Sequence, residues 1–287
     1  MPELISVIVT TYNRDDALAA VLRALTRQAD RNFEVIVADD GSGPATGELV
    51  TRWSSQLKQL GHVWQEHRGF RAAEIRNRAI AEANGDLCIF LDGDCIPRPD
   101  FVAVHRRLAE PGWFVAGNRV LLSRQLTERV LRDQLEPELW PLSQWMQLRG
   151  RGEINRIQPL LSLPLGVIRH WGGLAWQSIR SANLAVHRKD LLQVDGFDAA
   201  FSGWGREDSD LVLRLMHSGV RRKDGRFGTG VLHLWHAPDD RSRLPINDKL
   251  LACAMDSGRT KAAVGLTALK HNDAEPTTMR NRGAPQS

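Results

Sequence analysis

Leu4-Ile5-Ser6-Val7-Ile8-Val9 is an almost unbroken apolar and β-branched run, and the polar residues Thr10-Thr11-Tyr12-Asn13 follow it directly. Such a run is typical of a strand that is buried on both faces of a sheet. Between 15 and 28 the apolar residues recur at helical spacing, and a second buried run occupies 33–38. Strand, helix and strand in this order predict a parallel βαβ unit.

The same alternation continues through about the first 120 residues. Helices are predicted over about 46–57 and 71–83, a short third strand over 62–65, and a fourth buried strand over Leu87-Cys88-Ile89-Phe90-Leu91. Repeated βαβ units predict an α/β fold, Rossmann-like in arrangement, with a mostly parallel sheet and flanking helices on both faces.

The regular alternation stops at about residue 121. From Pro141 to Arg180 there are five basic residues and one acidic residue, a local charge of 5 − 1 = +4. Between about 121 and 180 there are also tryptophans separated by prolines, namely Trp140, Trp145, Trp171 and Trp176. Further along, strands are predicted over 181–187 and 230–235, helices over 188–194 and 207–218, and a disordered tail over 271–287.

Composition excludes several classes of protein. The chain has 287 residues, of which 42% are hydrophobic and 25% charged, as in ordinary globular proteins. It contains no apolar run long enough for a transmembrane helix, and Met1 to Val9 does not resemble a signal peptide. Cys88, Cys95 and Cys253 are scattered, which predicts free thiols and a cytoplasmic location. A net charge of +4 is too small to indicate nucleic-acid binding.

Polar and acidic residues follow three of the predicted strands: Thr10-Thr11, Asp39-Asp40 and Asp92-Gly93-Asp94. The carboxyl ends of parallel strands meet at one sheet edge, where ligands bind. The sequence contains neither a dinucleotide-binding G-x-G-x-x-G after the first strand nor a P-loop. A diphosphate at this acidic edge requires a divalent cation, and hard oxygen ligands suit Mg²⁺ or Mn²⁺. The alternative for each motif is an acidic turn that closes a strand.

Gly203-Trp204-Gly205-Arg206-Glu207-Asp208-Ser209-Asp210 is the most specific motif in the chain. A tryptophan between glycines offers a flat apolar face to a sugar ring. Glu207 and Asp208 begin a predicted helix, whose dipole favours an ionised carboxylate that can serve as general base toward a hydroxyl. The alternative is a core tryptophan beside an acidic first helical turn.

His233-Leu234-Trp235-His236 places two imidazoles at the end of a predicted strand. Either imidazole is a candidate to complete a metal site with Asp94, because imidazole is a common ligand of divalent transition metals. The alternative is that one or both are histidines with a purely structural role.

Together these motifs resemble the family 2 nucleotide-sugar glycosyltransferases of the GT-A fold. The likeness rests on residues 9–13, Asp39-Asp40-Gly41-Ser42, Arg76-Asn77 and Asp92-Gly93-Asp94. A second block resembles the acceptor-side module of β-1,4-galactosyltransferases, polypeptide N-acetylgalactosaminyltransferases and bacterial chondroitin polymerases. It comprises Asn183, Gly196-Phe197-Asp198 and 203–208. The two blocks cover roughly 4–120 and 180–240, and 121–180 matches no family.

The resemblance implies a role for each matched residue. On the donor side, Thr10 and Asp40 would hold the uracil and ribose of a UDP-sugar, Asp92 would contact the ribose, and Arg71 or its rival Arg76 the nucleotide. The remaining roles are metal binding by Asp94 and His236, with His233 as a weaker ligand, general-base catalysis by Asp208, and acceptor-sugar contacts by Trp204 and Glu207. Some relatives have three consecutive acids where this chain has Glu-Asp-Ser-Asp, so the acceptor contacts are expected to differ.

The implied protein is an inverting glycosyltransferase that needs Mn²⁺ or Mg²⁺ and moves a sugar from a UDP-sugar to a glycan or lipid-linked glycan. Bacterial surface polysaccharide or lipopolysaccharide synthesis is the expected pathway. A single GT-A domain is expected over 1–270, with a nucleotide-sugar half (1–120), a Trp-rich insertion (121–180) and an acceptor half (181–270).

Three alternatives remain open at this point. The Trp- and Arg-containing insertion suits peripheral contact with an anionic membrane at its inner face, but also core packing or a dimer contact. A sugar-nucleotide nucleotidyltransferase would use the same acidic edge, although Thr10 to Arg14 lacks the glycine of a phosphate loop. A noncatalytic sugar-binding protein would not need every one of these carboxylates.

Overall fold

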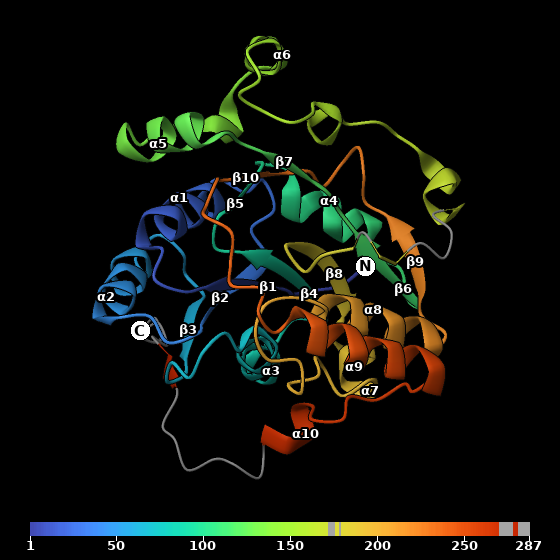
Figure 1. The fold of residues 1–287 in the computed structure, drawn as a ribbon. Coiled ribbons are helices and arrows are strands. Elements are labelled where there is room, and N and C mark those ends of the chain that lie inside the picture. The colour runs from blue at the N-terminus through green and yellow to red at the C-terminus, as the bar shows by residue number, and fades with distance from the viewer. Residues whose placement is uncertain (172–175, 178, 270–277, 281–287) are drawn as a thin grey trace, which may run out of the picture.

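A computed structural model describes residues 1–171, 176–177, 179–269 and 278–280. Its central element is an eight-stranded mixed sheet that carries helices on both faces (Figure 1). In spatial order the strands are β11 (Thr278–Arg280), β3 (Leu60–Trp64), β2 (Phe33–Asp39), β1 (Ile5–Thr11), β4 (Leu87–Asp92), β8 (Asn183–His187), β6 (Trp113–Ala116) and β9 (Arg221–Asp224).

The sheet is mostly parallel, as the sequence predicts. Strands β3, β2, β1 and β4 run parallel to one another. Strand β8 is antiparallel to both β4 and β6, and β9 is parallel to β6. The strand β8 therefore joins the N-terminal half of the chain to the later half by inserting between β4 and β6.

Burial on both faces explains the apolar run that begins the chain. Along β1, Ile5, Val7 and Val9 belong to one hydrophobic cluster, whereas Ile8 belongs to a second cluster on the opposite face. The first cluster includes residues of α1 (Asp15–Thr26), α2 (Pro44–Trp53) and α4 (Phe101–Leu108). The second includes residues of α3 (Ala72–Glu82), α7 (Arg188–Gln193), α8 (Glu207–His217) and α10 (Leu266–Leu269), and α9 (Leu244–Ser257) packs on α8.

A separate three-stranded sheet lies beside the acidic edge. Its order is β5 (Cys95–Pro97), β10 (Val231–His233) and β7 (Arg119–Leu121), with β10 antiparallel to β5 and parallel to β7. This small sheet brings the residues after β4 next to the late segment that carries both candidate metal histidines.

The middle segment is helical and irregular. It contains α5 (Arg124–Arg132), α6 (Leu142–Gly150) and the 3-10 turns η1 (Pro137–Leu139), η2 (Gln158–Leu160) and η3 (Gly166–Trp171). Figure 1 shows α5 and α6 standing away from the large sheet at the top of the view. No helix within the described ranges is long and apolar enough to cross a membrane.

The predicted tail is partly wrong. Residues 278–280 form β11, which pairs in antiparallel fashion with β3, because the outer edge of β3 offers free backbone groups to a passing segment. The other residues of the predicted disordered tail that fall between 271 and 287 lie outside the described residues. Several elements were also not predicted, namely the short elements β5, β6, β7, β9 and α4 and the longer helix α9.

Candidate active site

The carboxyl ends of β1, β2 and β4 bring the predicted donor-side residues together. Thr10 lies opposite Asp92 in the parallel pairing of β1 with β4, and the Asp40 N–H donates to the carbonyl of Thr11 at 3.0 Å. Gly93 closes the turn after β4 by donating its N–H to the Thr10 carbonyl at 2.7 Å. A Cβ at Gly93 would lie 3.0 Å from that same oxygen, so the close backbone approach favours glycine.

Asp40 lies in a buried hydrogen-bond network. Its side chain is 4% exposed, its Oδ1 accepts from Nε2 of Gln65 at 2.6 Å, and its Oδ2 accepts from the N–H of Arg71 at 2.7 Å. Burial raises the pKa of Asp40, and the two hydrogen bonds oppose this rise. Both carboxylate oxygens of Asp40 already accept a hydrogen bond, so a contact with the nucleoside would use their remaining lone pairs. This predicted contact stays a prediction.

The two candidate arginines differ in what their side chains contact. Arg71 precedes α3, and its guanidinium donates to Glu74 at 2.8 Å and to the carbonyl of Glu66. Arg76 lies on α3 and is 4% exposed; its Nε donates to Oγ1 of Thr10 at 3.1 Å. Of the two arginines, Arg76 is therefore the one whose side chain reaches the end of β1.

Arg76 also joins the donor-side and acceptor-side acids. Its guanidinium lies 3.4 Å from Asp92, 3.3 Å from Glu207 and 3.7 Å from Asp208. Burial disfavours its charge, but the nearby carboxylates outweigh this and raise the pKa of Arg76. One buried cation thus holds three carboxylates that come from both halves of the chain.

Two carboxylates of this cluster, Glu207 and Asp92, are hard to ionise. Burial raises the pKa of Glu207 to about 7, and the adjacent Asp208 adds to the rise. Burial likewise raises the pKa of Asp92 to about 6, against the effect of Arg76. At Glu207, desolvation therefore opposes the helix dipole, which favours an ionised carboxylate at this helix start.

The loop before α8 has a strained backbone that a neighbouring helix fixes. Gly203, Gly205 and Arg206 all have positive φ, at 74°, 100° and 81°. Asn247 of α9 is fully buried and donates to the carbonyls of Ser202 and Gly205 at 3.2 and 2.9 Å. These bonds hold the segment that presents Trp204 and starts α8 at Glu207.

Trp204 is not the freely exposed platform that the sequence predicts. Its side chain is only partly exposed, and the guanidinium of Arg241 lies 4.7 Å from the centroid of its ring. A cation over an aromatic face is attracted by the ring quadrupole. An acceptor sugar could stack on this face only after Arg241 had moved. With Arg241 in place, the sugar would have to use the opposite face of the ring.

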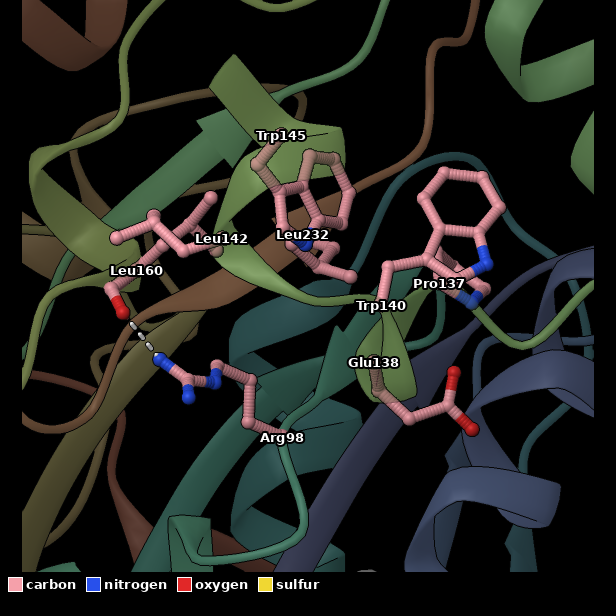
Figure 2. A pocket seen from close by; sticks show the side chains of 8 residues that line it. All are labelled: Arg98, Pro137, Glu138, Trp140, Leu142, Trp145, Leu160 and Leu232. Atoms are coloured by element: carbon pink, nitrogen blue, oxygen red, sulfur yellow. Dashed lines mark hydrogen bonds between the residues drawn. The ribbon is translucent and has the colours of Figure 1, made fainter. Parts of the chain in front are cut away.

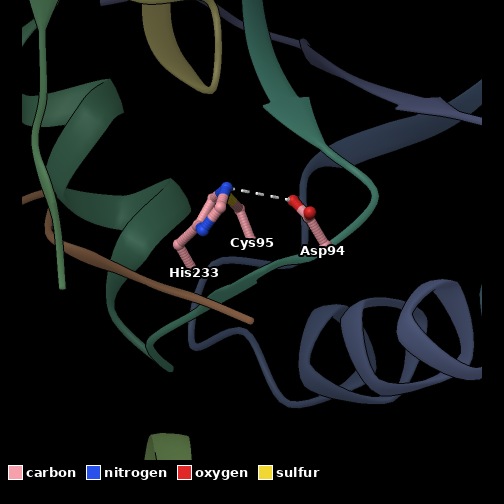
Figure 3. Close-up of side chains that lie close together, drawn as sticks. All are labelled: Asp94, Cys95 and His233. Atoms are coloured by element: carbon pink, nitrogen blue, oxygen red, sulfur yellow. Dashed lines mark ion pairs between the residues drawn. The ribbon is translucent and has the colours of Figure 1, made fainter. Parts of the chain in front are cut away.

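Asp94 lies between the two predicted histidine ligands. Its Oδ1 is 3.7 Å from Nε2 of His233, and its Oδ2 is 3.5 Å from Nε2 of His236. The Oδ1 atom is buried and lacks a hydrogen-bond partner among the described residues. Figure 3 shows Cys95 beside Asp94 and His233, and ligand atoms of these three residues lie within 4.8 Å of one another. This unsatisfied oxygen and donor set fit a divalent cation.

The two imidazoles turn Nε2 toward Asp94. The Nδ1 of His236 lies 2.8 Å from the carbonyl of Ala237, which can only accept, so Nδ1 carries a proton and Nε2 is the nitrogen that faces Asp94. Burial lowers the pKa of His233 to about 4. His233 is therefore neutral at pH 7, and its contact with Asp94 is not an ion pair.

Two profiles of known families match the sequence. The profile of glycosyl transferase family 2 matches residues 6–163, more than half of the chain. The chain belongs to this family. A profile described as the N-terminal domain of galactosyltransferase matches residues 169–236. These matches confirm both parts of the resemblance drawn from the motifs. They also correct the expectation that 121–180 matches no family, because the first profile extends to residue 163 and the second begins at residue 169.

Curated relatives of this family 2 domain are longer proteins. The validoxylamine A glucosyltransferase of Streptomyces hygroscopicus subsp. limoneus is 30% identical over 248 residues, which cover 83% of this chain and 52% of that enzyme. The chondroitin synthase of Escherichia coli is 28% identical over 235 residues, which cover 75% and 32%. The hyaluronan synthase of Pasteurella multocida is 28% identical over 225 residues, which cover 75% and 23%. The chain thus spans about half the length of the first of these relatives and less of the others.

Solved structures confirm the predicted GT-A fold. The crystal structure of TarS from S. aureus superposes with a TM-score of 0.61 at 15% identity, covering 87% of this chain and 39% of that one. The mannosyltransferase PcManGT from Pyrobaculum calidifontis superposes with a TM-score of 0.56 at 18% identity, covering 96% and 76%.

The middle tryptophans lie outside the cluster around Arg76. Trp145 is 3% exposed, and its ring centroid lies 5.3 Å from that of Trp140. Both rings line a small cavity of about 40 Å³, and Figure 2 shows them among the side chains around it. Trp176 is partly buried against two hydrophobic clusters, whereas Trp171 is 77% exposed. Packing therefore accounts for three of these tryptophans.

Several residues around the site were not predicted from the sequence. Gln65 and Asn247 act by hydrogen bonds to backbone or carboxylate groups, Arg241 covers Trp204, and Cys95 faces His233. Cys95 alone carried a visible signal, since it directly follows the Asp92-Gly93-Asp94 motif. The partners of the other three are distant in sequence.

Proposed function

We propose that this domain transfers a sugar from a UDP-sugar to a hydroxyl of a glycan or lipid-linked glycan, with inversion at the anomeric carbon. The observation that carries the proposal is the ion cluster in which Arg76 contacts Asp92 and, at 3.3 and 3.7 Å, Glu207 and Asp208. The cluster links the nucleotide-side acids to the acceptor-side acids, as a direct transfer between two substrates requires.

The donor side uses the residues at the ends of β1, β2 and β4. Thr10, Asp40 and Asp92 would hold the nucleoside, with Arg71 at the rim and Arg76 orienting Thr10 and Asp92. The fold neighbours support a nucleotide-sugar donor, since TarS has been solved with UDP and with UDP-GlcNAc, and PcManGT with GDP-Man and Mn²⁺. We favour UDP because of the motif resemblance.

Asp208 is the proposed general base. Its side chain is 13% exposed, and its Oδ1 has no hydrogen-bond partner within the described residues. The acceptor hydroxyl gives its proton to Asp208 as its oxygen bonds to the anomeric carbon, and the bond from that carbon to the UDP oxygen breaks. Attack on the face opposite the leaving group inverts the anomeric centre. Glu207 and Trp204 position the acceptor beside this base.

Asp94 and His236 would hold the divalent cation, Mn²⁺ or Mg²⁺, with His233 as a weaker partner. When bound, such an ion supplies positive charge against the diphosphate of the donor. The hydrogen bond from His236 Nδ1 to the Ala237 carbonyl fixes the imidazole so that Nε2 points toward Asp94. The expected pathway, surface polysaccharide or lipopolysaccharide synthesis, is supported only by the bacterial hyaluronan and chondroitin synthases among the relatives.

The stereochemistry of slow donor hydrolysis tests this function without a known acceptor. UDP-α-sugars are incubated with the protein and Mn²⁺, and the released sugar is observed by ¹H NMR before it mutarotates. An inverting transferase releases the β-anomer together with UDP. Release of the α-anomer would contradict inversion, and formation of pyrophosphate from UTP and a sugar phosphate would instead identify a nucleotidyltransferase.

A membrane contact through η3 extends the proposal. Val167, Ile168 and Trp171 of η3 are 71%, 54% and 77% exposed, which is unusual for large apolar side chains. The strand β9 packs beside η3, and Arg221 at its start is exposed, whereas Lys223 is buried and pairs with Glu110 at 2.9 Å. Exposed apolar side chains next to an exposed cation suit the interface of an anionic bilayer, where a lipid-linked acceptor would be met.

Liposome flotation tests this contact. Wild-type protein should float with vesicles that contain anionic lipid at low salt, and Val167→Ser with Trp171→Ser should reduce the floated fraction severalfold. The matched control replaces Arg149, Arg151 and Arg156, which lie on or after α6, with Ser and should change flotation less. Equal effects of the two sets, or no flotation of wild type, would contradict a contact through η3.

A further inference from the structure

We propose that Asp94, Cys95 and His233 form a second, inner metal site, which prefers thiophilic ions such as Zn²⁺, Co²⁺ and Cd²⁺ over Mg²⁺ and Mn²⁺. It shares Asp94 with the outer cation site of the proposed function but has its own donor atoms. The outer site needs only Asp94 and His236, and the thiol of Cys95 takes no part in it.

The small sheet builds this inner site. Cys95 is paired with His233 in the antiparallel ladder between β5 and β10, so their side chains project from the same face. The N–H of Leu234 donates to the Asp94 carbonyl at 2.9 Å and extends the pairing by one residue. One ligand atom from each of Asp94, Cys95 and His233 lies within 4.8 Å of the other two (Figure 3). Tetrahedral zinc sites have donors roughly 3.5–4 Å apart, so small side-chain movements would close this group on an ion.

The carboxylate of Asp94 faces one imidazole with each oxygen. Oδ1 lies 3.7 Å from His233, and Oδ2 lies 3.5 Å from His236. The two imidazole rings are 5.3 Å apart between centroids. The inner side is closed, because Cys95 is fully buried and Oδ1 of Asp94 is buried without a hydrogen-bond partner in the described part of the chain. The side chain of His236 is 32% exposed, so the outer side is open to a donor molecule.

The donor chemistry of the two sides selects different ions. A thiolate, an imidazole and one carboxylate are a typical set for Zn²⁺ and its analogues, whereas Mg²⁺ and Mn²⁺ prefer oxygen ligands. On binding, the Cys95 thiol loses its proton to solvent, and the sulfur lone pair forms the bond to the metal. The competing explanation is that Cys95, Asp94 and His233 simply pack together as a metal-free part of the core.

Shared use of Asp94 predicts competition, and this consequence rests on the proposed function. An ion on the inner side draws Oδ1 toward Cys95 and His233. Asp94 then binds the outer cation less well. Zn²⁺ should therefore inhibit UDP-sugar hydrolysis in the presence of Mn²⁺. The same Zn²⁺ should inhibit the Cys95→Ser variant less.

Cobalt spectroscopy tests the site itself, whether or not the protein is a transferase. The full chain carrying Cys253→Ser is used as the background, because Cys253 is an exposed thiol that could bind metals by itself. Titration with Co²⁺ should produce an ultraviolet thiolate-to-cobalt charge-transfer band that saturates at one ion per chain. Adding Cys95→Ser should abolish the band and weaken Co²⁺ binding by at least the roughly 10–100-fold that loss of an outer-shell partner costs.

Two histidine variants form a matched pair in the same background. His233→Ala should weaken the band strongly, whereas His236→Ala should leave it in place. The proposal would be overturned if the Cys253→Ser protein showed no band. It would also be overturned if the band survived in Cys95→Ser, or if the two histidine variants lost it equally. If Cys95→Ser fails to fold, the ¹¹³Cd NMR shift of Cd²⁺ bound to the Cys253→Ser protein decides instead. A shift typical of a sulfur ligand supports the site, and a shift typical of oxygen and nitrogen ligands alone contradicts it.

Discussion

Among single residues, Arg76 is the cation that lies next to three carboxylates of the site. Replacing it with Gln would leave Asp92, Glu207 and Asp208 in a buried cluster without their shared cation. We expect the free energy of unfolding to fall by about 3–5 kcal/mol, as when one partner of a buried ion pair is removed. Arg78→Gln on the same helix is the control and should cost within ~1 kcal/mol, because its partner Glu74 is partly exposed. Urea denaturation measures both, and equal losses would contradict the role given to Arg76.

Asp208→Asn tests the general base directly. The amide keeps the shape of the side chain but cannot take a proton, so turnover should fall by about 10²–10⁴-fold. Because Asp208 lies on the acceptor side, the affinity for UDP measured by calorimetry should stay within a few-fold of wild type. A loss of UDP affinity as large as the loss of turnover would show that Asp208 supports the structure of the donor site instead.

Glu207 predicts a pH dependence of stability. Burial raises the pKa of Glu207 to about 7, above the ~4.3 of an exposed glutamate. The folded protein therefore keeps a proton that the unfolded chain has lost, and this contribution to stability is full below pH ~4 and disappears as the pH rises through about 7. From about pH 5 to pH 8 the wild type should lose roughly 1–3 kcal/mol more than Glu207→Gln in thermal or urea unfolding. Parallel profiles for the two proteins would refute this assignment.

The candidate site could be predicted residue by residue where short motifs carry it. Asp92, Glu207 and Asp208 come together around Arg76, and Asp94 lies beside His233 and His236. The dual bonding of Asp40 and the cation over Trp204 could not be predicted, because Gln65 and Arg241 have no motif of their own. A sequence pattern indicates the chemistry that a residue can carry out, but it does not show which residue from a distant part of the chain will contact its side chain.

At the scale of elements, burial explains which parts were predicted. β1, β2 and β4 are buried on both faces over six or seven residues, so their apolar runs are visible in the sequence. Strands of three or four residues, such as β5 and β9, are too short to display a period, and β9 consists of charged residues. The helix α9 buries only Asn247, Leu251 and Ala254, which leaves a weak apolar stripe.

Helix α9 nevertheless has a specific role in the loop that precedes α8. Asn247→Ala removes the hydrogen bonds to the carbonyls of Ser202 and Gly205, and we expect a loss of about 1–3 kcal/mol in unfolding free energy. Turnover should fall while UDP affinity is kept, because the loosened loop carries acceptor residues. Lys249→Ala on the exposed face of α9 should change neither stability nor turnover. An Asn247→Ala protein with wild-type turnover would show that the loop does not depend on this anchor.

At the scale of the whole molecule, the site exists only because two distant parts of the chain share one sheet. The antiparallel pair of β4 with β8 joins them, and β10 brings His233 beside the residues that follow β4. The order of the two regions that match known families, 6–163 and 169–236, could be predicted from the motifs. The antiparallel insertion of β8 could not, because alternating strands and helices give the direction of a strand only where a βαβ crossover precedes it.

We propose that one cation-dependent site binds a uridine nucleotide where the parts of the chain joined by β4 and β8 meet. Calorimetric titration of UDP into wild type and Asp94→Asn, each with Mn²⁺ and with EDTA, measures this binding. We predict one binding site in wild type with Mn²⁺, weakened by roughly tenfold or more, about 1.4 kcal/mol, in EDTA or in Asp94→Asn, with GDP and CMP binding more weakly than UDP. The proposed site would be contradicted if UDP bound with equal strength in all four conditions, or if GDP bound as tightly as UDP.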